Sequence, residues 1–232
     1  MTITTLGLQN FTLLLAGLIN LTMSILVFSR GVKHNKINLY FSLLTFFNFL
    51  WAFALLLANI FSNNALAEIS YRTSYLAAVG IAVSLFYFSL YFPYKIKNLK
   101  LYNNVLVLIF SAIILVFIYS KWHIIFFERG LNLSNWLIDY YKPFYVVYSL
   151  FFLSLVISAI CFLVSRLYNL ESWLKRRIKI LLITIIVGLV FGVYFDLILC
   201  YFGNFNYIWF GPIFTAFMNI YVFYLIFHNK EK

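Results

Sequence analysis

One apolar stretch limits the folds open to this chain more than any other feature. Residues 180–201 are hydrophobic almost throughout, and they follow directly on a basic segment at residues 173–179. A helix of about twenty apolar residues crosses the ~30 Å hydrocarbon core of a bilayer. The stretch therefore predicts a transmembrane helix whose first end is held at the membrane surface by charged residues.

Small and polar residues share one side of this predicted helix. Thr184, Gly188, Gly192 and Asp196 recur at every fourth position, and residues four apart lie on one helix face. Glycines on such a face allow transmembrane helices to approach each other closely. We therefore expect this side to contact protein, with Gly188 and Gly192 in helix packing. The same role is expected for glycines of two other apolar runs, Gly17 and Gly80.

Asp196 is the only acidic residue that falls inside a predicted span. A carboxylate costs about 2.5–3.5 kcal/mol at the centre of a transmembrane helix on insertion scales, so its presence requires a reason. Asp196 lies roughly sixteen residues, or ~24 Å, beyond the basic segment, in the outer third of the bilayer. Two interpretations stay open: a ligand-binding acid in a pocket, and a solvated or hydrogen-bonded structural acid.

Four residues of other apolar runs are candidates to line a ligand pocket with Asp196. They are polar or aromatic and lie on stripes that we expect to face inward: Asn48, Trp51, Tyr87 and Asn219. Hydrogen bonds between helices that serve stability alone are the alternative use of such side chains.

Composition extends the membrane prediction to the whole chain. Hydrophobic residues make up 65% of the sequence and charged residues 10%, against about 25% charged residues in soluble domains. We predict an all-α membrane protein, one domain over residues 1–232, built as a seven-transmembrane helix bundle. The predicted spans are approximately residues 8–28, 37–61, 74–94, 104–120, 144–165, 180–201 and 211–227. The interruption at residues 121–143 is expected to lie on the outer membrane surface, with Asn132 or Ser134 capping a short helix.

The distribution of Lys and Arg predicts the orientation in the membrane. With the N-terminus outside and the C-terminus in the cytoplasm, thirteen of the 17 Lys and Arg residues fall in cytoplasmic segments, as the positive-inside rule requires. Four of them precede the sixth span and are expected to anchor its inner end: Lys175, Arg176, Arg177 and Lys179. Docking of a partner or of anionic lipid is the alternative role. The net charge of +11 therefore requires no nucleic-acid partner.

The sequence offers little material for catalysis. The 3 histidines lie in different segments, and no two have the spacing of metal ligands. Neither a Gly-x-Ser-x-Gly nor a Cys-x-x-Cys motif occurs. We therefore expect no enzymatic activity, no catalytic residues, no metal and no cofactor.

Short runs along the chain carry a family pattern. The second and third spans contain Asn-Leu-Tyr-Phe at residues 38–41, Leu-Trp-Ala at residues 50–52 and Phe-Ser-Leu-Tyr-Phe-Pro at residues 88–93. The basic segment at residues 173–179, the pair Gly211-Pro212 and Tyr224 complete the pattern. In their order and spacing these runs resemble the N-terminal seven-transmembrane sensor region of bacterial membrane histidine kinases, and the resemblance covers nearly the whole chain.

The resemblance implies a sensory module in a bacterial inner or plasma membrane. Family members continue into a cytoplasmic transmitter, whereas no phospho-accepting His-Glu box and no Gly-rich nucleotide lid follow the last span here. We therefore expect a module that binds an unknown small ligand or responds to membrane lipids, and that signals to a separate cytoplasmic effector such as a kinase. A small transporter or channel and a structural membrane subunit are the alternatives, and a homo-oligomer is left open.

Overall fold

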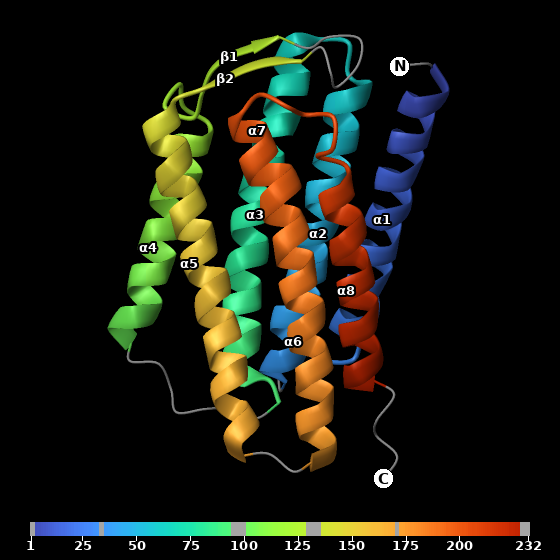
Figure 1. The fold of residues 1–232 in the computed structure, drawn as a ribbon, viewed down its shortest axis with the longest axis vertical. Helices are drawn as coiled ribbons and strands as arrows, with labels where there is room; N and C mark the ends of the chain where they lie inside the picture. Colours follow the sequence, from blue (N-terminus) through green and yellow to red (C-terminus); the bar gives the residue numbers. More distant parts are fainter. Residues whose placement is uncertain (1–2, 33–34, 94–100, 129–135, 170–171, 228–232) are drawn as a thin grey trace.

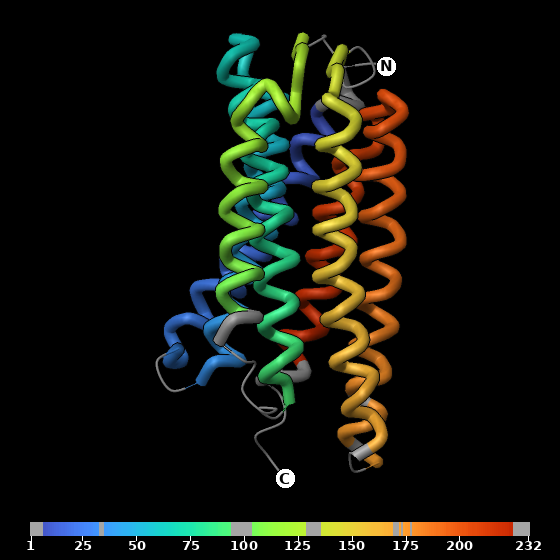
Figure 2. Tube along the Cα trace, turned by 90° about the vertical axis from the view of Figure 1, so that its left-hand side faces the viewer, coloured from blue at the N-terminus to red at the C-terminus, as the bar shows by residue number. Residues whose placement is uncertain are grey.

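The computed structural model of the protein describes residues 3–32, 35–93, 101–128, 136–169 and 172–227. Within these ranges, long helical segments run side by side along one common axis (Figures 1 and 2). They are α1 (Ile3–Ser29), α2 (Lys36–Ile60), α3 (Asn64–Tyr91), α4 (Leu101–Ile118), α5 (Lys142–Arg166), the continuous run of α6 (Ser172–Gly192), η3 (Val193–Ile198) and α7 (Leu199–Tyr201), and α8 (Phe210–Phe227). A 3-10 turn, η2 (Leu167–Asn169), follows α5.

Helices α2 and α3 form the centre of the bundle. α2 packs on α1, α3 and α8, while α3 also packs on α4 and α5. α8 packs on both α6 and α1, so it joins the last part of the chain to the first (Figure 1). This arrangement brings α2, α3, α5, α6 and α8 around a common interior.

Capping residues explain where the central helices begin. The Asn35 side chain accepts a hydrogen bond from the amide of Ile37 at 3.0 Å, at the start of α2. Asn63 does the same at α3, with the amides of Ala65 and Leu66 as donors. These side chains satisfy amides that have no partner inside the helix. Helix α3 therefore begins at Asn64, well before the predicted start of its span at residue 74.

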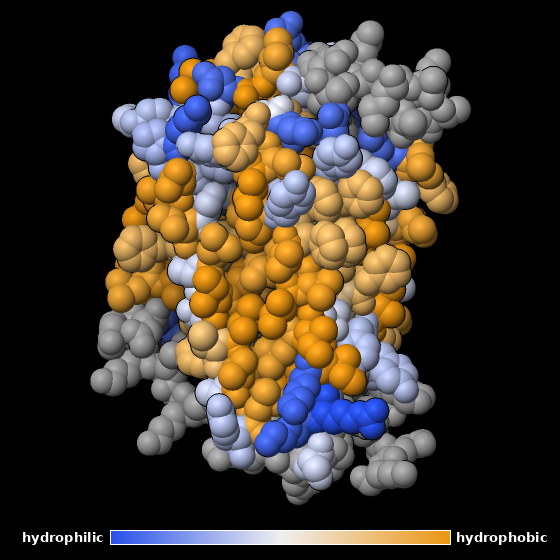
Figure 3. Space-filling model, in the orientation of Figure 1, coloured by the Kyte–Doolittle hydropathy of each residue, from blue (hydrophilic) through white to orange (hydrophobic). Residues whose placement is uncertain are grey.

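The outer surface of the bundle is apolar between two hydrophilic ends (Figure 3). Five helical segments of the described residues are long and apolar enough to cross a membrane: Gly7–Ser29, Lys36–Ile60, Asn64–Tyr91, Lys142–Arg166 and Leu174–Tyr201. Two further apolar helices are shorter, Asn104–Ile118 and Phe210–Tyr224. Because many large apolar side chains of α1, α4, α5, α6 and α8 remain exposed, the solvent that suits this surface is lipid.

A β-hairpin covers one end of the bundle, which we call the hairpin end (Figure 1). Strands β1 (Ile124–Glu128) and β2 (Leu137–Tyr140) pair antiparallel, with Ile124 opposite Tyr140. Ile124, Phe127, Trp136 and Tyr140 are buried, so the hairpin turns an apolar face towards the helix ends. The interruption at residues 121–143 is therefore a hairpin in its described parts. Asn132 and Ser134, the expected helix caps, lie outside the described residues.

The opposite end of the bundle carries the start of α6, and we call it the basic end. Arg176 and Lys179 are exposed there and Lys175 is half-buried, whereas the side chain of Arg177 lies outside the described set. Hydrophilic side chains gather over this part of the surface in Figure 3. Arg166 at the end of α5 is buried, and its Nη2 donates to the Leu90 carbonyl at 2.6 Å.

Candidate functional site

The π-helical turn η3 interrupts the long helical run formed by α6 and α7, and it contains Asp196. A π-turn inserts one extra residue and shifts the backbone hydrogen bonds, and such turns are frequent at functional sites. Neighbouring side chains support this one. The Tyr145 hydroxyl on α5 donates to the Leu197 carbonyl at 3.0 Å and lies 3.3 Å from the Asp196 carbonyl. The Cys200 thiol contacts the Phe195 carbonyl at 3.6 Å.

The Asp196 side chain lies where three elements meet. A β-carbon added at Gly211, in the first turn of α8, would overlap Asp196 Oδ2 and would lie 2.5 Å from Cη2 of Trp51 on α2. The carboxylate thus occupies space that is open only because residue 211 has no side chain. Asp196 Oδ2 is buried and has no hydrogen-bond partner among the described residues. Buried carboxylates without partners are rare because they lose their hydration without compensation.

Asp196 lines a cavity of about 100 Å³ inside the bundle. Its walls come from α2, α3, α5, α6, η3, α7 and α8, together with Ile208. Five aromatic side chains contribute, namely Trp51, Tyr71, Tyr75, Tyr148 and Phe152. Most of the remaining wall is aliphatic, so the cavity is an apolar space with a single carboxylate at its edge.

Several other polar groups at or beside the cavity wall have partners inside the protein. The hydroxyls of Tyr71, Tyr75 and Tyr140 form a triangle, in which Tyr140 lies 2.7 Å from each of the other two. The Ser74 hydroxyl donates to the Tyr71 carbonyl at 2.6 Å, and Thr215 donates to the Pro212 carbonyl at 3.0 Å. Asp196 Oδ2 differs from these groups because it is an acceptor without a donor.

The structure divides the predicted pocket residues between different places. Trp51 lines the cavity with Asp196, whereas Asn48, Tyr87 and Asn219 are not among its lining residues. Asn219 donates to Asn20 on α1 at 2.7 Å, and Asn48 donates to the Leu44 carbonyl of its own helix. Tyr87 stacks on Tyr40 with ring centroids 5.1 Å apart. These five side chains therefore do not line one pocket: Asn48 bonds within its own helix, and Asn219 and Tyr87 contact partners outside the cavity.

The glycines expected in helix packing also fall into two groups. A β-carbon at Gly80 would overlap the ring of Phe47, and one at Gly17 would lie 3.6 Å from Phe49 and 3.7 Å from Ala52. Around Gly188 the nearest atom is the Met218 sulfur at 3.9 Å, and nothing lies within 4 Å at Gly192. Both α6 glycines line the cavity, so in this structure they leave space where close helix contact was expected.

Several cavity residues were missed by the sequence analysis. Tyr71 and Tyr75 on α3 and Tyr148 on α5 are almost fully buried, and the first two are spaced to share a helix face. This four-residue spacing is the sequence pattern that could have pointed to them. The chain contains 18 Tyr and 28 Phe residues, however, so pairs of aromatic residues at that spacing are too frequent to single out a site.

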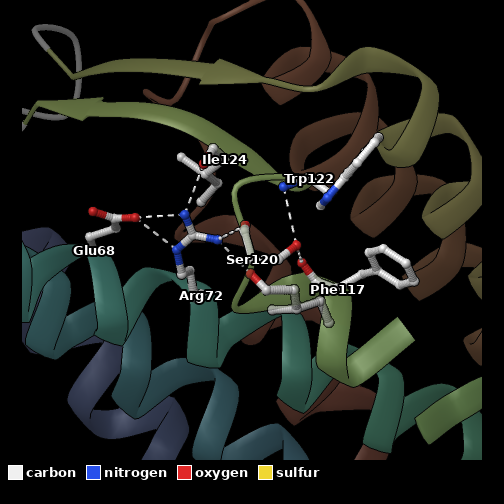
Figure 4. Close-up of polar contacts among 7 residues, drawn as sticks. Glu68, Arg72, Phe117, Ser120, Trp122 and Ile124 are labelled. Carbon is white, nitrogen blue, oxygen red and sulfur yellow. Dashed lines mark hydrogen bonds and ion pairs between the residues drawn. The ribbon is translucent and has the colours of Figure 1, made fainter. Parts of the chain in front are cut away.

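Arg72 fixes the hairpin over this site (Figure 4). It pairs with Glu68 at 2.6 Å, and its Nη1 donates to the carbonyls of Ile118 and Ser120 at 2.6 and 2.8 Å. Its Nη2 donates to the Ile124 carbonyl of β1 at 2.9 Å. In Figure 4 the guanidinium points from α3 into the connection between α4 and β1. We call these contacts the Arg72 clamp. Because β1 pairs with β2, and β2 carries Tyr140, the Arg72 clamp also helps to position the hydroxyl triangle of Tyr71, Tyr75 and Tyr140.

His123 lies beside this clamp and is fully buried. Its ring packs edge-on to Tyr75, with centroids 4.4 Å apart, and neither ring nitrogen has a hydrogen-bond partner among the described residues. Burial, and then the nearby charge of Arg72, lower the pKa of His123 to about 3. His123 is therefore neutral at physiological pH. No group of three or more metal-ligating side chains with suitable geometry occurs in the described parts of the chain.

The helices and their apolar surface define a multi-pass membrane protein with an interior cavity. Within that class, the chain belongs to the family described as the N-terminal 7TM region of histidine kinase, whose match covers residues 12–230. The match confirms the family resemblance and the predicted seven-transmembrane helix bundle. No curated protein matches the chain.

Proposed function

We propose that the protein is a membrane sensory module that receives a signal at the hairpin end and passes it to a cytoplasmic partner, such as a kinase, at the basic end. Family membership supports a sensory role, because the family is the input region of histidine kinases. The exposed Arg176 and Lys179 support a cytoplasmic basic end in a bacterial plasma membrane.

One observation carries the proposal for a binding role. The carboxylate oxygen Asp196 Oδ2 is buried at an apolar cavity without any donor from the described residues. An acceptor kept in this state destabilises the fold unless something else compensates. A molecule that occupies the cavity and offers a donor supplies that compensation.

The arrangement around the cavity supplies a route for a signal. Asp196 sits in a π-turn whose carbonyls are held by Tyr145 of α5, and its carboxylate touches the first turn of α8. A change at Asp196 therefore acts on α5, α6 and α8 together. Because α6 begins and α8 ends at the basic end, a shift along either helix reaches the surface where an effector is proposed to bind.

A chimera tests this function directly. Residues 1–232 are joined to a cytoplasmic histidine-kinase transmitter with a known response regulator and a fluorescent reporter, and the reporter is read under varied solutes and lipid compositions. We expect at least one condition to change the output, and Asp196→Asn to reduce that change. Asp139→Asn is the matched control, because Asp139 is exposed on β2 and outside the cavity.

Transport is the competing function, and flux separates it from sensing. If the purified protein moves a solute across proteoliposomes while the chimera shows no response under any condition, the sensory proposal is wrong. Reporter fusions after residue 227 and in the hairpin test the orientation: a C-terminus outside the cytoplasm would contradict it.

A further inference from the structure

The cavity beside Asp196 contains an acceptor but no cation of its own. Its lining residues, drawn from the described part of the chain, include no Lys, Arg or His. The Ser74 and Thr215 hydroxyls at its wall already donate to backbone carbonyls. An occupant that hydrogen-bonds Asp196 Oδ2 supplies the donor that the structure does not show there, and a positively charged donor both favours the ionised form of the carboxyl group and bonds to it most strongly.

The aromatic walls favour the same charge. Trp51 touches the space occupied by the carboxylate, since both Trp51 Cη2 and Asp196 Oδ2 lie against Gly211. The other aromatic side chains of the wall are Tyr71, Tyr75, Tyr148 and Phe152. The faces of such rings attract an organic cation, most strongly when it is removed from water. A cation held at Asp196 is thus stabilised both by the carboxylate and by the neighbouring rings.

The rest of the cavity sets the size and polarity of the molecule that carries this cation. A volume of about 100 Å³ is smaller than the ~150 Å³ apolar cavity that accepts benzene in an engineered protein. Side chains such as Leu55, Leu85 and Val156 form its aliphatic wall. This wall suits a short hydrocarbon body and offers no groups to solvate a phosphate or a second charge.

We propose that the Asp196 cavity binds the ammonium end of a small hydrophobic amine, with the ammonium group at the carboxylate and a short hydrocarbon chain along the aromatic and aliphatic walls. The inference deepens the proposed sensory function and rests on it for the role of the ligand. The binding step itself is independent of signalling.

Three probes of equal length and different charge test the ligand class: n-butylammonium, n-butanol and butyrate. Binding to the purified full chain in detergent is followed by saturation-transfer NMR and by titration calorimetry. We expect saturable binding of butylammonium, at least tenfold weaker binding of butanol, and no binding of butyrate. Equal binding of butylammonium and butanol, or no saturable binding of butylammonium, would overturn the proposal.

Two variants locate the site. Asp196→Asn keeps the shape of the side chain and removes its charge, so we expect it to weaken butylammonium binding at least tenfold, while Asp139→Asn binds as the native chain does. Gly192→Ala places a methyl group where nothing lies within 4 Å. It should preserve the fold and weaken butylammonium binding by reducing the cavity. Unchanged butylammonium binding in both Asp196→Asn and Gly192→Ala would show that the amine binds elsewhere, and the proposal would fail.

The two proposals fail in different ways. If butylammonium binds at Asp196 but the transmitter chimera responds to nothing, the ligand class stands and the sensory function falls. If the chimera responds to a stimulus while butylammonium does not bind, the sensory function stands and the ligand class falls.

Discussion

The carboxylate of Asp196 lies against the main chain of Gly211, so closely that a β-carbon at position 211 would overlap Oδ2. The contact joins the π-turn η3 to the first turn of α8, and Trp51 of α2 borders the same space. Position 211 therefore requires glycine, because a side chain there would collide with the Asp196 carboxylate. Neither residue shows this relationship when its own segment is considered alone.

The first prediction concerns this contact. Gly211→Ala should push the Asp196 carboxylate out of its position and destabilise the protein by about 1–3 kcal/mol, the usual cost of overpacking. The measurement is the free energy of unfolding in mixed detergent and denaturant, together with butylammonium binding, which should also weaken. Gly7→Ala is the control, because nothing lies within 4 Å of a β-carbon there. Equal stability of the two variants would contradict the packing described at Gly211.

A second prediction tests the support of the π-turn. Tyr145→Phe removes the hydroxyl that donates to the Leu197 carbonyl at 3.0 Å. We expect a loss of about 1–3 kcal/mol, since a buried acceptor loses its donor without access to water. Tyr168→Phe serves as the control because Tyr168 is 81% exposed. Hydrogen exchange at residues 193–198 should rise in the first variant only, and unchanged exchange there would show that Tyr145 does not hold the turn.

A third prediction tests the clamp under the hairpin. Arg72→Lys keeps a positive charge but cannot reach Glu68 and the carbonyls of Ser120 and Ile124 with one planar group. We expect faster hydrogen exchange in β1 and β2 and a loss of roughly 2 kcal/mol or more, because buried carbonyls lose their donors. Lys121→Met is the matched control on the exposed surface nearby. A hairpin that stays as protected as in the native chain would mean that charge alone holds it.

The fourth prediction follows from His123, whose pKa is lowered to about 3 by burial and by Arg72. In the unfolded chain the pKa is ~6.5, so between pH 6.5 and pH 3 the unfolded state binds more protons than the folded state. Stability from the neutral histidine is therefore complete above pH 6.5 and is lost as the pH falls. The slope should not exceed about 1.4 kcal/mol per pH unit.

Unfolding measured from pH 7 to pH 4 checks this dependence. His123→Phe keeps an aromatic ring beside Tyr75 and cannot be protonated, so its stability should fall less over the same interval. Identical pH profiles for the two proteins would assign the dependence to other groups.

The membrane class could be predicted from sequence because bilayer thickness imposes a simple rule. A run such as residues 180–201 must span, whatever surrounds it, since lipid satisfies no backbone hydrogen bonds. The helices accordingly lie near the predicted ranges. Helix α3 begins at Asn64, before the predicted span at residues 74–94, and in this first part of the helix Glu68 and Arg72 pair with each other. The hairpin was missed because its strands, Ile124–Glu128 and Leu137–Tyr140, are short.

By itself, then, the sequence determined that the chain is a seven-helix membrane protein of the sensor family, and it singled out Asp196 and Trp51. Only the tertiary structure decided that these two residues meet at Gly211, that Asn219 turns away to Asn20, and that Tyr71, Tyr75 and Tyr148 line the same cavity as Asp196. The physical reason lies in the helices themselves. Most of their surface is apolar, and the polar stripes along them are narrow and fix the rotation only loosely, so the faces that meet are chosen mainly by packing against partners far away in the chain.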